Sequence, residues 1–335
     1  MSISIGDLAR TVALTRQTSG LKVELDRSLI ELTTGTTSDI SKAVKGDFTS
    51  LAAIDRSITM YSAYDYSSTE AARLASAQQD ALDDLHVMLQ SRGTQLAAAA
   101  SVGMDSSVKA ILSETRSDFD MALSRLNTTT GGRAAFAGAD TQGAVMVSAD
   151  EILTSLRTAI GLAATAEDVM AEVDAWFDAP GGGFETDGYL GSADALSPIR
   201  LDDNRSVSLD TTALDSALRD TLKGFAVGSL VQDGLLESND AEQSKLAKIA
   251  GEEMIGAQDG LVALRASIGT SQAKIESATV RNAVQLSALT QARSEIVGVD
   301  QYEAANRLSA VQAQLETLYT VTARLSQLSL AKALG

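Results

Sequence analysis

The last 35 residues of the chain, 301–335, read QYEAANRLSAVQAQLETLYTVTARLSQLSLAKALG and decide the fold. The stretch has no proline, and its single glycine is the final residue, so nothing in it interrupts a helix. Apolar and small residues follow one another at alternating intervals of three and four, which gives a helix one continuous seam. The seam consists of Leu308, Val311, Leu315, Leu318, Thr322, Leu325 and Ser329. A helix of about 36 residues is about 54 Å long and needs a partner to cover such a seam.

The other end of the chain offers that partner. Leucines and valines recur there mostly at intervals of three and four, and Thr33-Thr34-Gly35 ends the pattern with a glycine in the position of a helix C-cap. We therefore expect the two terminal helices to pack together and to form the interface through which the protein assembles. The residues predicted for this coiled-coil interface are Leu8, Val12, Leu21, Leu25, Leu29, Leu32, Leu308, Val311, Leu315, Leu318, Leu325 and Leu328.

Charge is distributed unevenly along the chain, whose formal net charge is −17. Residues 1–50 have six basic and six acidic side chains, and 296–335 have three of each, whereas 140–240 have nineteen acidic and five basic ones. Neutral ends can lie side by side without mutual repulsion, and an acidic middle suits a surface that faces solvent. The acidic balance argues against nucleic acid and anionic membranes as partners.

The sequence outside the two ends is mainly helical as well. Only two prolines occur, Pro180 and Pro198, so the long stretches on either side of them are free to be helical. Apolar periodicity predicts long helices over about 49–101, 106–126 and 214–296, the last with an interruption near Ser238.

The middle of the chain has a different pattern. Residues 144–148 favour a short strand, 149–177 favour one helix, and the alternation at 199–209 is typical of a β-hairpin. The expected fold is mainly α, a long helical hairpin or coiled-coil rod of paired N- and C-terminal segments with a small inserted mixed α/β domain. The predicted domains are inner terminal helices at 1–45 and 296–335, a helical rod at 46–138 and 226–295, and a variable solvent-facing α/β domain at 139–225.

No arrangement of residues in the sequence indicates catalysis, a cofactor or a metal site. The only histidine, His86, lies in a helical run, and the nearby Asp83 and Asp84 do not share a helix face with it that would make a site. The chain has no cysteine and no Walker, Rossmann or zinc motif. Four aromatic residues favour a small domain core over a ligand pocket: Trp176, Phe177, Phe184 and Tyr189. We therefore expect a protein that is not an enzyme and uses no cofactor.

Membrane insertion is not expected either. No stretch approaches the roughly 20 consecutive apolar residues that cross a bilayer. The first seven residues lack the basic and apolar regions of a cleaved signal peptide. We expect that, if the protein is exported, it leaves the cell by a route that needs no such signal.

Several short segments, in the same order along the chain, resemble the flagellin superfamily, the axial proteins of the bacterial flagellum. The stretch Glu-Leu-Thr-Thr-Gly that ends at Gly35 resembles the end of the first helix of the family. Residues 267–270 resemble the isoleucine-glycine turn, at Gly269, before the second-to-last helix. Residues 299–305, which include Asp300, resemble the C-terminal signature.

One further segment discriminates within the superfamily. Gly-Arg-Ala-Ala-Phe-Ala-Gly resembles the glycine-x-tyrosine-leucine-phenylalanine-x-glycine stretch of the hook–filament junction branch, the FlgL type, with Gly132, Phe136 and Gly138 in place. Ala134 and Ala135 stand where that pattern has an aromatic residue and a leucine. The serine-aspartate-aspartate-proline stretch of the family is also reduced here. These departures leave flagellin itself open as an alternative.

The resemblance implies a structural subunit of the flagellum at the hook–filament junction, outside the cell, exported through the flagellar type III channel. The implied partners are copies of the same chain, the first hook-associated junction protein, flagellin, a cytosolic export chaperone and the export apparatus. The terminal helices would form the inner coiled coil of the assembly, and the variable domain would face solvent. The alternatives are flagellin, the filament subunit, and a type III-secreted helical effector, which would not need a matched pair of ends.

Overall fold

A computed structural model describes residues 5–101 and 103–334, except for the side chains of 5–8, 326 and 328–334. The chain divides into two compact units, the first formed by 1–62 with 284–335 and the second by 63–283. Both units are mainly helical, which confirms the expected fold class. No helix in the described residues is long and apolar enough to cross a membrane. The division into three domains stays a prediction.

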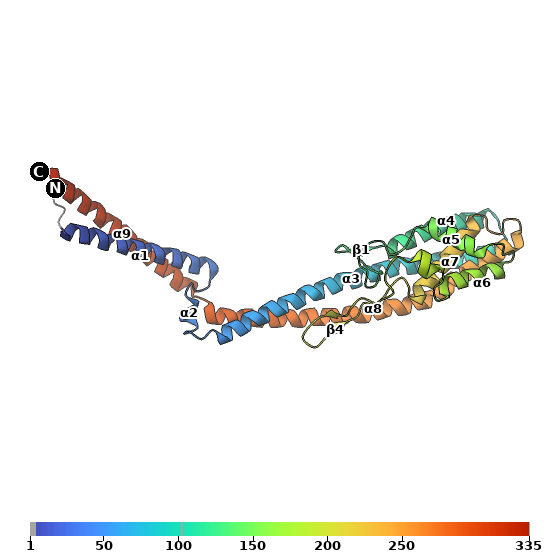
Figure 1. The fold of residues 1–335 in the computed structure, drawn as a ribbon, viewed down its shortest axis with the longest axis horizontal. Coiled ribbons are helices and arrows are strands. Elements are labelled where there is room, and N and C mark those ends of the chain that lie inside the picture. The colour runs from blue at the N-terminus through green and yellow to red at the C-terminus, as the bar shows by residue number, and fades with distance from the viewer. Residues whose placement is uncertain (1–4, 102, 335) are drawn as a thin grey trace. The chain divides into compact units, whose positions relative to one another are not determined.

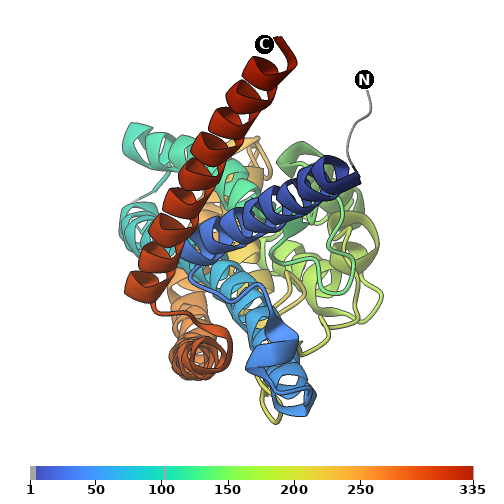
Figure 2. The same ribbon diagram turned by 90° about the vertical axis from the view of Figure 1, so that its left-hand side faces the viewer.

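The first unit is built on the two terminal helices, α1 (Ile5–Thr34) and α9 (Gln301–Leu334), which lie side by side in Figure 1 and cross in Figure 2. Helix α1 is ended by the residue that follows it, Gly35, whose φ of 68° lies in the left-handed region that glycine adopts without strain. Helix α9 begins after Asp300, whose Oδ1 accepts hydrogen bonds of 2.8 and 3.3 Å from backbone N–H groups of the first turn. The short helix α2 (Ile40–Ala43) follows α1.

Two very long helices contribute residues to both units. They are α3 (Thr49–Ala100) and α8 (Asp240–Val297), and they match the predicted helices at 49–101 and in the second part of 214–296. Helix α8 passes through Gly269 without interruption, so the turn that the family resemblance placed there is wrong for this chain. A glycine can continue a helix, at a cost of about 1 kcal/mol relative to alanine, because its own N–H and carbonyl take part in the helical hydrogen-bond pattern.

The core of the second unit surrounds one helix, α7 (Ser216–Gln232), in which all residues from 221 to 231 are buried. Helices α4 (Ser106–Leu126), α5 (Ala149–Ile160) and α6 (Ala166–Asp178) contact it. Even its lysine, Lys223, is buried, because carboxylates of α6 accept hydrogen bonds from the Nζ at 2.8 and 2.5 Å. Figure 1 shows α7 beside α4, α5 and α6.

Short strands and one π-helical turn complete the second unit. Each of its two hairpins is antiparallel and pairs only two residues per strand. The hairpin expected at 199–209 is therefore confirmed. The strands are β1 (Thr129–Thr130) with β2 (Arg133–Ala134) and β3 (Ile199–Arg200) with β4 (Ser206–Val207), and the π-helical turn is Phe184–Gly188.

The single helix expected at 149–177 is wrong, because the chain leaves α5 and starts again at α6. Gly161, with a φ of 57°, ends α5, and the Oγ1 of Thr165 caps α6 by accepting a hydrogen bond from the backbone N–H of Asp168. The aromatic side chains expected in a small core are buried beside these helices, with the rings of Phe177 and Phe184 stacked 5.4 Å apart.

The strand expected at 144–148 is also wrong. Met146 forms only an isolated bridge with Tyr189. Two backbone hydrogen bonds join 145–147 to 188–190, and the Oδ1 of Asn127 accepts two more, from the N–H groups of Val145 at 2.7 Å and Met146 at 2.9 Å. The side-chain amide satisfies N–H groups that a second neighbouring strand would otherwise have to pair with, so no regular strand forms.

Candidate assembly interface

One face of α1 lies against one face of α9 and forms the core of the first unit. Apart from Glu31 and Ala305, the described buried and half-buried residues of both helices follow intervals of three and four, or of seven between Leu318 and Leu325, as in a coiled coil. On α9 they are Ala304, Leu308, Val311, Leu315, Leu318 and Leu325. On α1 they are Leu14, Thr18, Leu21, Leu25, Ser28 and Leu32. We call these twelve residues the terminal seam.

Eight of the predicted interface residues belong to the terminal seam. They are Leu21, Leu25, Leu32, Leu308, Val311, Leu315, Leu318 and Leu325. Val12 and Leu29 do not belong to it, because they are 46% and 49% exposed. The side chains of Leu8 and Leu328 lie outside the described residues. The role of all twelve predicted residues in contacts between subunits stays a prediction.

The sequence prediction missed four members of the terminal seam, Leu14, Thr18, Ser28 and Ala304. Two of them are polar, so a stripe traced through leucines and valines alone passes over them. The signal that would have found the three on α1 is the uninterrupted spacing of 4, 3, 4, 3, 4 from Leu14 to Leu32. A coiled-coil seam tolerates small polar residues at some positions, at a cost in stability.

A second apolar row follows the opposite side of α1. Val12, Val23 and Ile30 are 46%, 69% and 53% exposed. Their separations of eleven and seven residues return to nearly the same side of a helix, about 140–200° around the axis from Leu21 and Leu25. The row therefore faces away from α9 and is open to contact with another molecule.

The segment after α1 pairs with the junction between α8 and α9. The N–H of Thr37 donates to the carbonyl of Val297 at 2.7 Å, and the N–H of Val299 donates to the carbonyl of Gly35 at 3.0 Å. Thr36 and Gly298 form the bridge between these two bonds. The family-like positions Gly35 and Asp300, from opposite ends of the sequence, are thereby brought together.

A buried carboxylate fixes this junction. Glu31, on α1, is only 3% exposed. Its Oε1 accepts a hydrogen bond from the N–H of Ser38 at 3.0 Å, and its Oε2 accepts one from the Nη1 of Arg307 on α9 at 3.2 Å. A buried carboxylate is tolerated when both oxygens are paired, and a pairing with arginine is strong. The sequence prediction missed this pair, because nothing in the sequence indicates that Arg307 reaches Glu31.

The family-like positions Gly132, Phe136 and Gly138 lie in the second unit. Phe136 is fully buried, and its carbonyl accepts a hydrogen bond from the N–H of Ala213 at 3.0 Å. Gly138 has a φ of 64°, and a Cβ there would lie 2.5 Å from the carbonyl oxygens of Ser192 and Asp194. Only glycine fits such a close approach of two backbone segments. Phe136 and Gly138 therefore contribute to the packing of the unit, whereas Gly132 is exposed and has a left-handed φ of 78° in the turn between β1 and β2.

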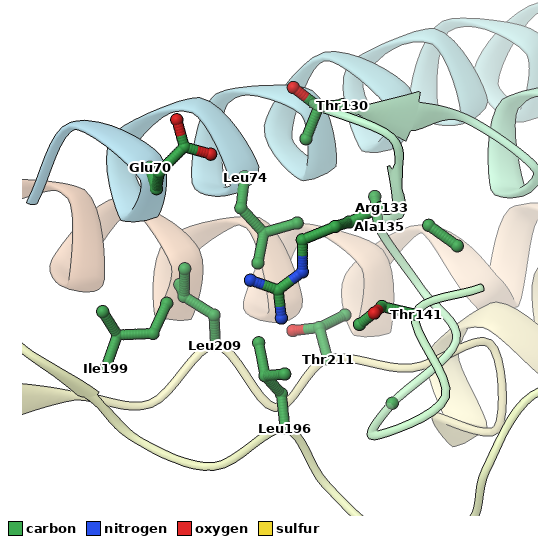
Figure 3. Close-up of a pocket in the computed structure, with 12 residues that line it drawn as sticks. Glu70, Leu74, Thr130, Arg133, Ala135, Thr141, Leu196, Ile199, Leu209 and Thr211 are labelled. Carbon is green, nitrogen blue, oxygen red and sulfur yellow. The ribbon is translucent and has the colours of Figure 1, made fainter. Parts of the chain in front are cut away.

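A small pocket beside this segment leaves no room for a cofactor. It encloses about 20 Å³, which is space for one water molecule. Figure 3 shows the guanidinium of Arg133 directed into it, among Leu74, Leu196 and Leu209. Within the described residues, no group of three or more histidines and carboxylates is placed to hold a metal ion. His86 is half-buried in α3.

Tyr189 provides a pH-dependent probe of the same region. Its hydroxyl donates to the carbonyl of Ser192 at 3.0 Å. Burial, with a smaller contribution from the charge of Asp140, raises the pKa of Tyr189 from 10.0 to about 12. Because the folded pKa lies above the unfolded value, the stabilising contribution is complete below pH 10 and is lost as the pH rises towards 12.

We expect one of the six tyrosines to ionise close to pH 12 in an absorbance titration of phenolate formation. This late step should disappear in the Tyr189→Phe variant, whereas a Tyr66→Phe variant should keep it, because Tyr66 is exposed. A late step that survives in Tyr189→Phe would show that another tyrosine carries it.

Comparison with known proteins supports the resemblance in two ways. Residues 254–334 match a protein family described as the bacterial flagellin C-terminal helical region. The solved structure of Bacillus cereus FlgL covers 72% of this chain and is itself covered completely, with a TM-score of 0.52 and 14% sequence identity. The fold of the chain is therefore similar to that of a FlgL protein.

A second solved structure is described as a flagellar hook-associated protein from Vibrio parahaemolyticus. It covers 71% of this chain, and 99% of it is covered, with a TM-score of 0.36 and 13% identity. No curated protein sequence matches the chain. The resemblance to the flagellin superfamily is confirmed by the C-terminal family match and the FlgL-like fold.

Proposed function

We propose that the chain is a non-enzymatic structural subunit of the bacterial flagellum that joins the hook-associated junction to the flagellin filament. One observation carries the proposal. The part of the chain that matches the flagellin C-terminal helical region includes α9, the helix that packs against α1 in the terminal seam. The family match and the terminal seam therefore both include α9.

The surface of the terminal helices supports a role in a polymer. The terminal seam is covered within the chain, but the row of Val12, Val23 and Ile30 is exposed. Covering apolar surface contributes about 25 cal/mol per Å², so a neighbouring subunit that covers this row would stabilise the assembly. The neutral charge of both ends allows many copies to be packed closely.

The proposed partners follow from this position. They are copies of the same chain, the first hook-associated junction protein on one side and flagellin on the other. Before export, a cytosolic chaperone would cover the terminal helices, and the flagellar type III apparatus would export the chain without a cleaved signal. The acidic stretch 140–240 would face solvent outside the cell.

A strain that lacks the chain tests the proposal. Hooks should still form, filaments should be absent, and flagellin should accumulate in the medium, because it is exported with no layer on which to polymerise. Electron microscopy of the cell surface and quantification of secreted flagellin measure the two effects. Normal filaments on the deletion strain would contradict the proposal, and expression of the chain from a plasmid serves as the control.

Flagellin is the second candidate, because the matching C-terminal region is described as that of flagellin. The same strain distinguishes the two functions. If the chain is the filament subunit, its deletion removes the filament and leaves no flagellin in the medium. Abundance gives an independent answer, since a filament subunit is present in thousands of copies and a junction subunit in few.

A further inference from the structure

Three basic side chains line one groove between the β3–β4 hairpin and α8. Arg205 comes from the turn of the hairpin, and Lys274 and Arg281, seven residues apart, come from one side of α8. The groove encloses about 510 Å³ and is also lined by the hydroxyls of Ser206 and Ser277. The groove is positively charged, whereas the chain as a whole has a formal net charge of −17.

The positive charge of the groove is only partly neutralised. The Oδ2 of Asp202 lies 3.9 Å from both the Nε of Arg205 and an Nη of Arg281, so one carboxylate is shared between two guanidinium groups at long distance. Within the described residues, Lys274 has no carboxylate within ion-pair distance. Asp202 is thus the one carboxylate within ion-pair distance of these three basic groups among the described residues, and all three keep free N–H donors.

The two walls of the groove are fixed to one another. The buried amide of Asn282, on α8, donates to the carbonyl of Leu201 at 2.8 Å, next to the hairpin turn. The hydroxyl of Tyr64, on α3, donates to the Oδ1 of Asp203 at 2.9 Å. The Nη1 of Arg281 donates to the Oγ of Ser277 at 2.6 Å, which orients the guanidinium. A site whose side chains are held in place loses less entropy when it binds a ligand.

We infer that this groove binds a multivalent oxyanion, with Arg205, Lys274 and Arg281 as donors. Guanidinium groups match the geometry of phosphate and carboxylate oxygens, and an ammonium group adds a point charge. The oxyanion could come from a free polyanion in solution or from clustered carboxylates on a second copy of this chain. The inference does not depend on the proposed position in the flagellum.

Isothermal titration of pyrophosphate into the full chain, at fixed ionic strength, tests the inference. We expect saturable binding that is weakened about tenfold or more in the double variant Lys274→Gln/Arg281→Gln, because a hydrogen bond to a charged group contributes at least that factor. The control variant Lys109→Gln/Lys248→Gln removes the same charge from exposed positions of α4 and α8 and should bind as the unchanged protein does.

Equal binding by the two double variants would overturn the inference, as would an equal response to chloride at the same ionic strength. If the loss of the Arg281–Ser277 bond disturbs folding, the single variant Lys274→Gln replaces the double one, because Lys274 is exposed. Sedimentation velocity at low salt shows whether the bound oxyanion comes from a second copy of the chain or from solution. Association that increases with protein concentration and is reversed by pyrophosphate indicates a second copy, and a monomer at all concentrations indicates a free anion.

Discussion

Replacement of Leu315 by aspartate is expected to separate the two terminal helices and to prevent the chain from assembling. Leu315 is 6% exposed and lies in the middle of the terminal seam. Loss of a buried leucine costs about 2–5 kcal/mol, and an unpaired carboxylate in its place adds a further cost. Separation of α1 from α9 hydrates the new charge, so we expect the seam to open.

Amide hydrogen exchange measures the opening. Peptides from α1 and α9 should lose their protection in Leu315→Asp, whereas peptides from α7 should keep it, because α7 belongs to the second unit. The matched control is Ala313→Asp, which places the same charge two residues earlier at an exposed position. Equal protection of α1 in both variants would contradict the importance of the seam.

The effect on assembly is measured in cells. A deletion strain that expresses Leu315→Asp should resemble the strain without the chain, with hooks but no filaments. If hydrogen exchange shows an open seam and filaments still form, the terminal seam exists in the isolated chain but is not needed for assembly. The proposed function and the structure of the seam are thus tested separately.

The pairing of the ends could be predicted because the sequence of α9 leaves few alternatives. Its spacing of three and four continues from Leu308 to Leu325, and most members are large and apolar. On α1 the same spacing includes Thr18 and Ser28, which are polar and are therefore not found by a search for apolar residues. Leu29, which directly follows Ser28, was predicted to belong to the interface, but it is 49% exposed. The spacing of apolar residues therefore identifies the buried face of a helix only where the buried positions are occupied by apolar residues.

The junction after α1 could be predicted only in part. The left-handed residue at Gly35 and the cap at Asp300 have recognisable sequence signals. Their pairing with each other depends on backbone hydrogen bonds and on the contact between Glu31 and Arg307, which lie at opposite ends of the sequence. A single sequence does not indicate which charged side chains meet across such a separation.

The inserted part was the least predictable, because its backbone is held by side chains and glycines. Asn127 holds the segment that was expected to be a strand. Gly161 ends a helix that apolar periodicity alone would continue, and its left-handed φ could have been suspected from the sequence. The long helices α3 and α8 also need glycines where their backbones approach one another closely.

Replacement of Gly251 by alanine is expected to destabilise the second unit by about 1–3 kcal/mol. A Cβ at Gly251, on α8, would lie 2.5 Å from the backbone nitrogen of Ala97 and 2.9 Å from its Cα, on α3. Gly93, on the same stretch of α3, makes the approach possible from the other side, because its Cβ would lie 3.0 Å from that of Met254. Helix α3 would have to move away from α8, and forced overpacking of this kind costs about 1–3 kcal/mol or more.

A control on the same helix should change stability in the opposite direction. Gly256 is exposed, and nothing lies within 4 Å of a Cβ placed there. Alanine at this position should stabilise the helix by up to about 1 kcal/mol, because it loses less backbone entropy than glycine when the chain folds. Urea unfolding of both variants, followed by far-UV circular dichroism, compares the two free energies. If Gly251→Ala is as stabilising as Gly256→Ala, α3 and α8 do not approach one another as closely as described, and the glycine is not needed for their packing.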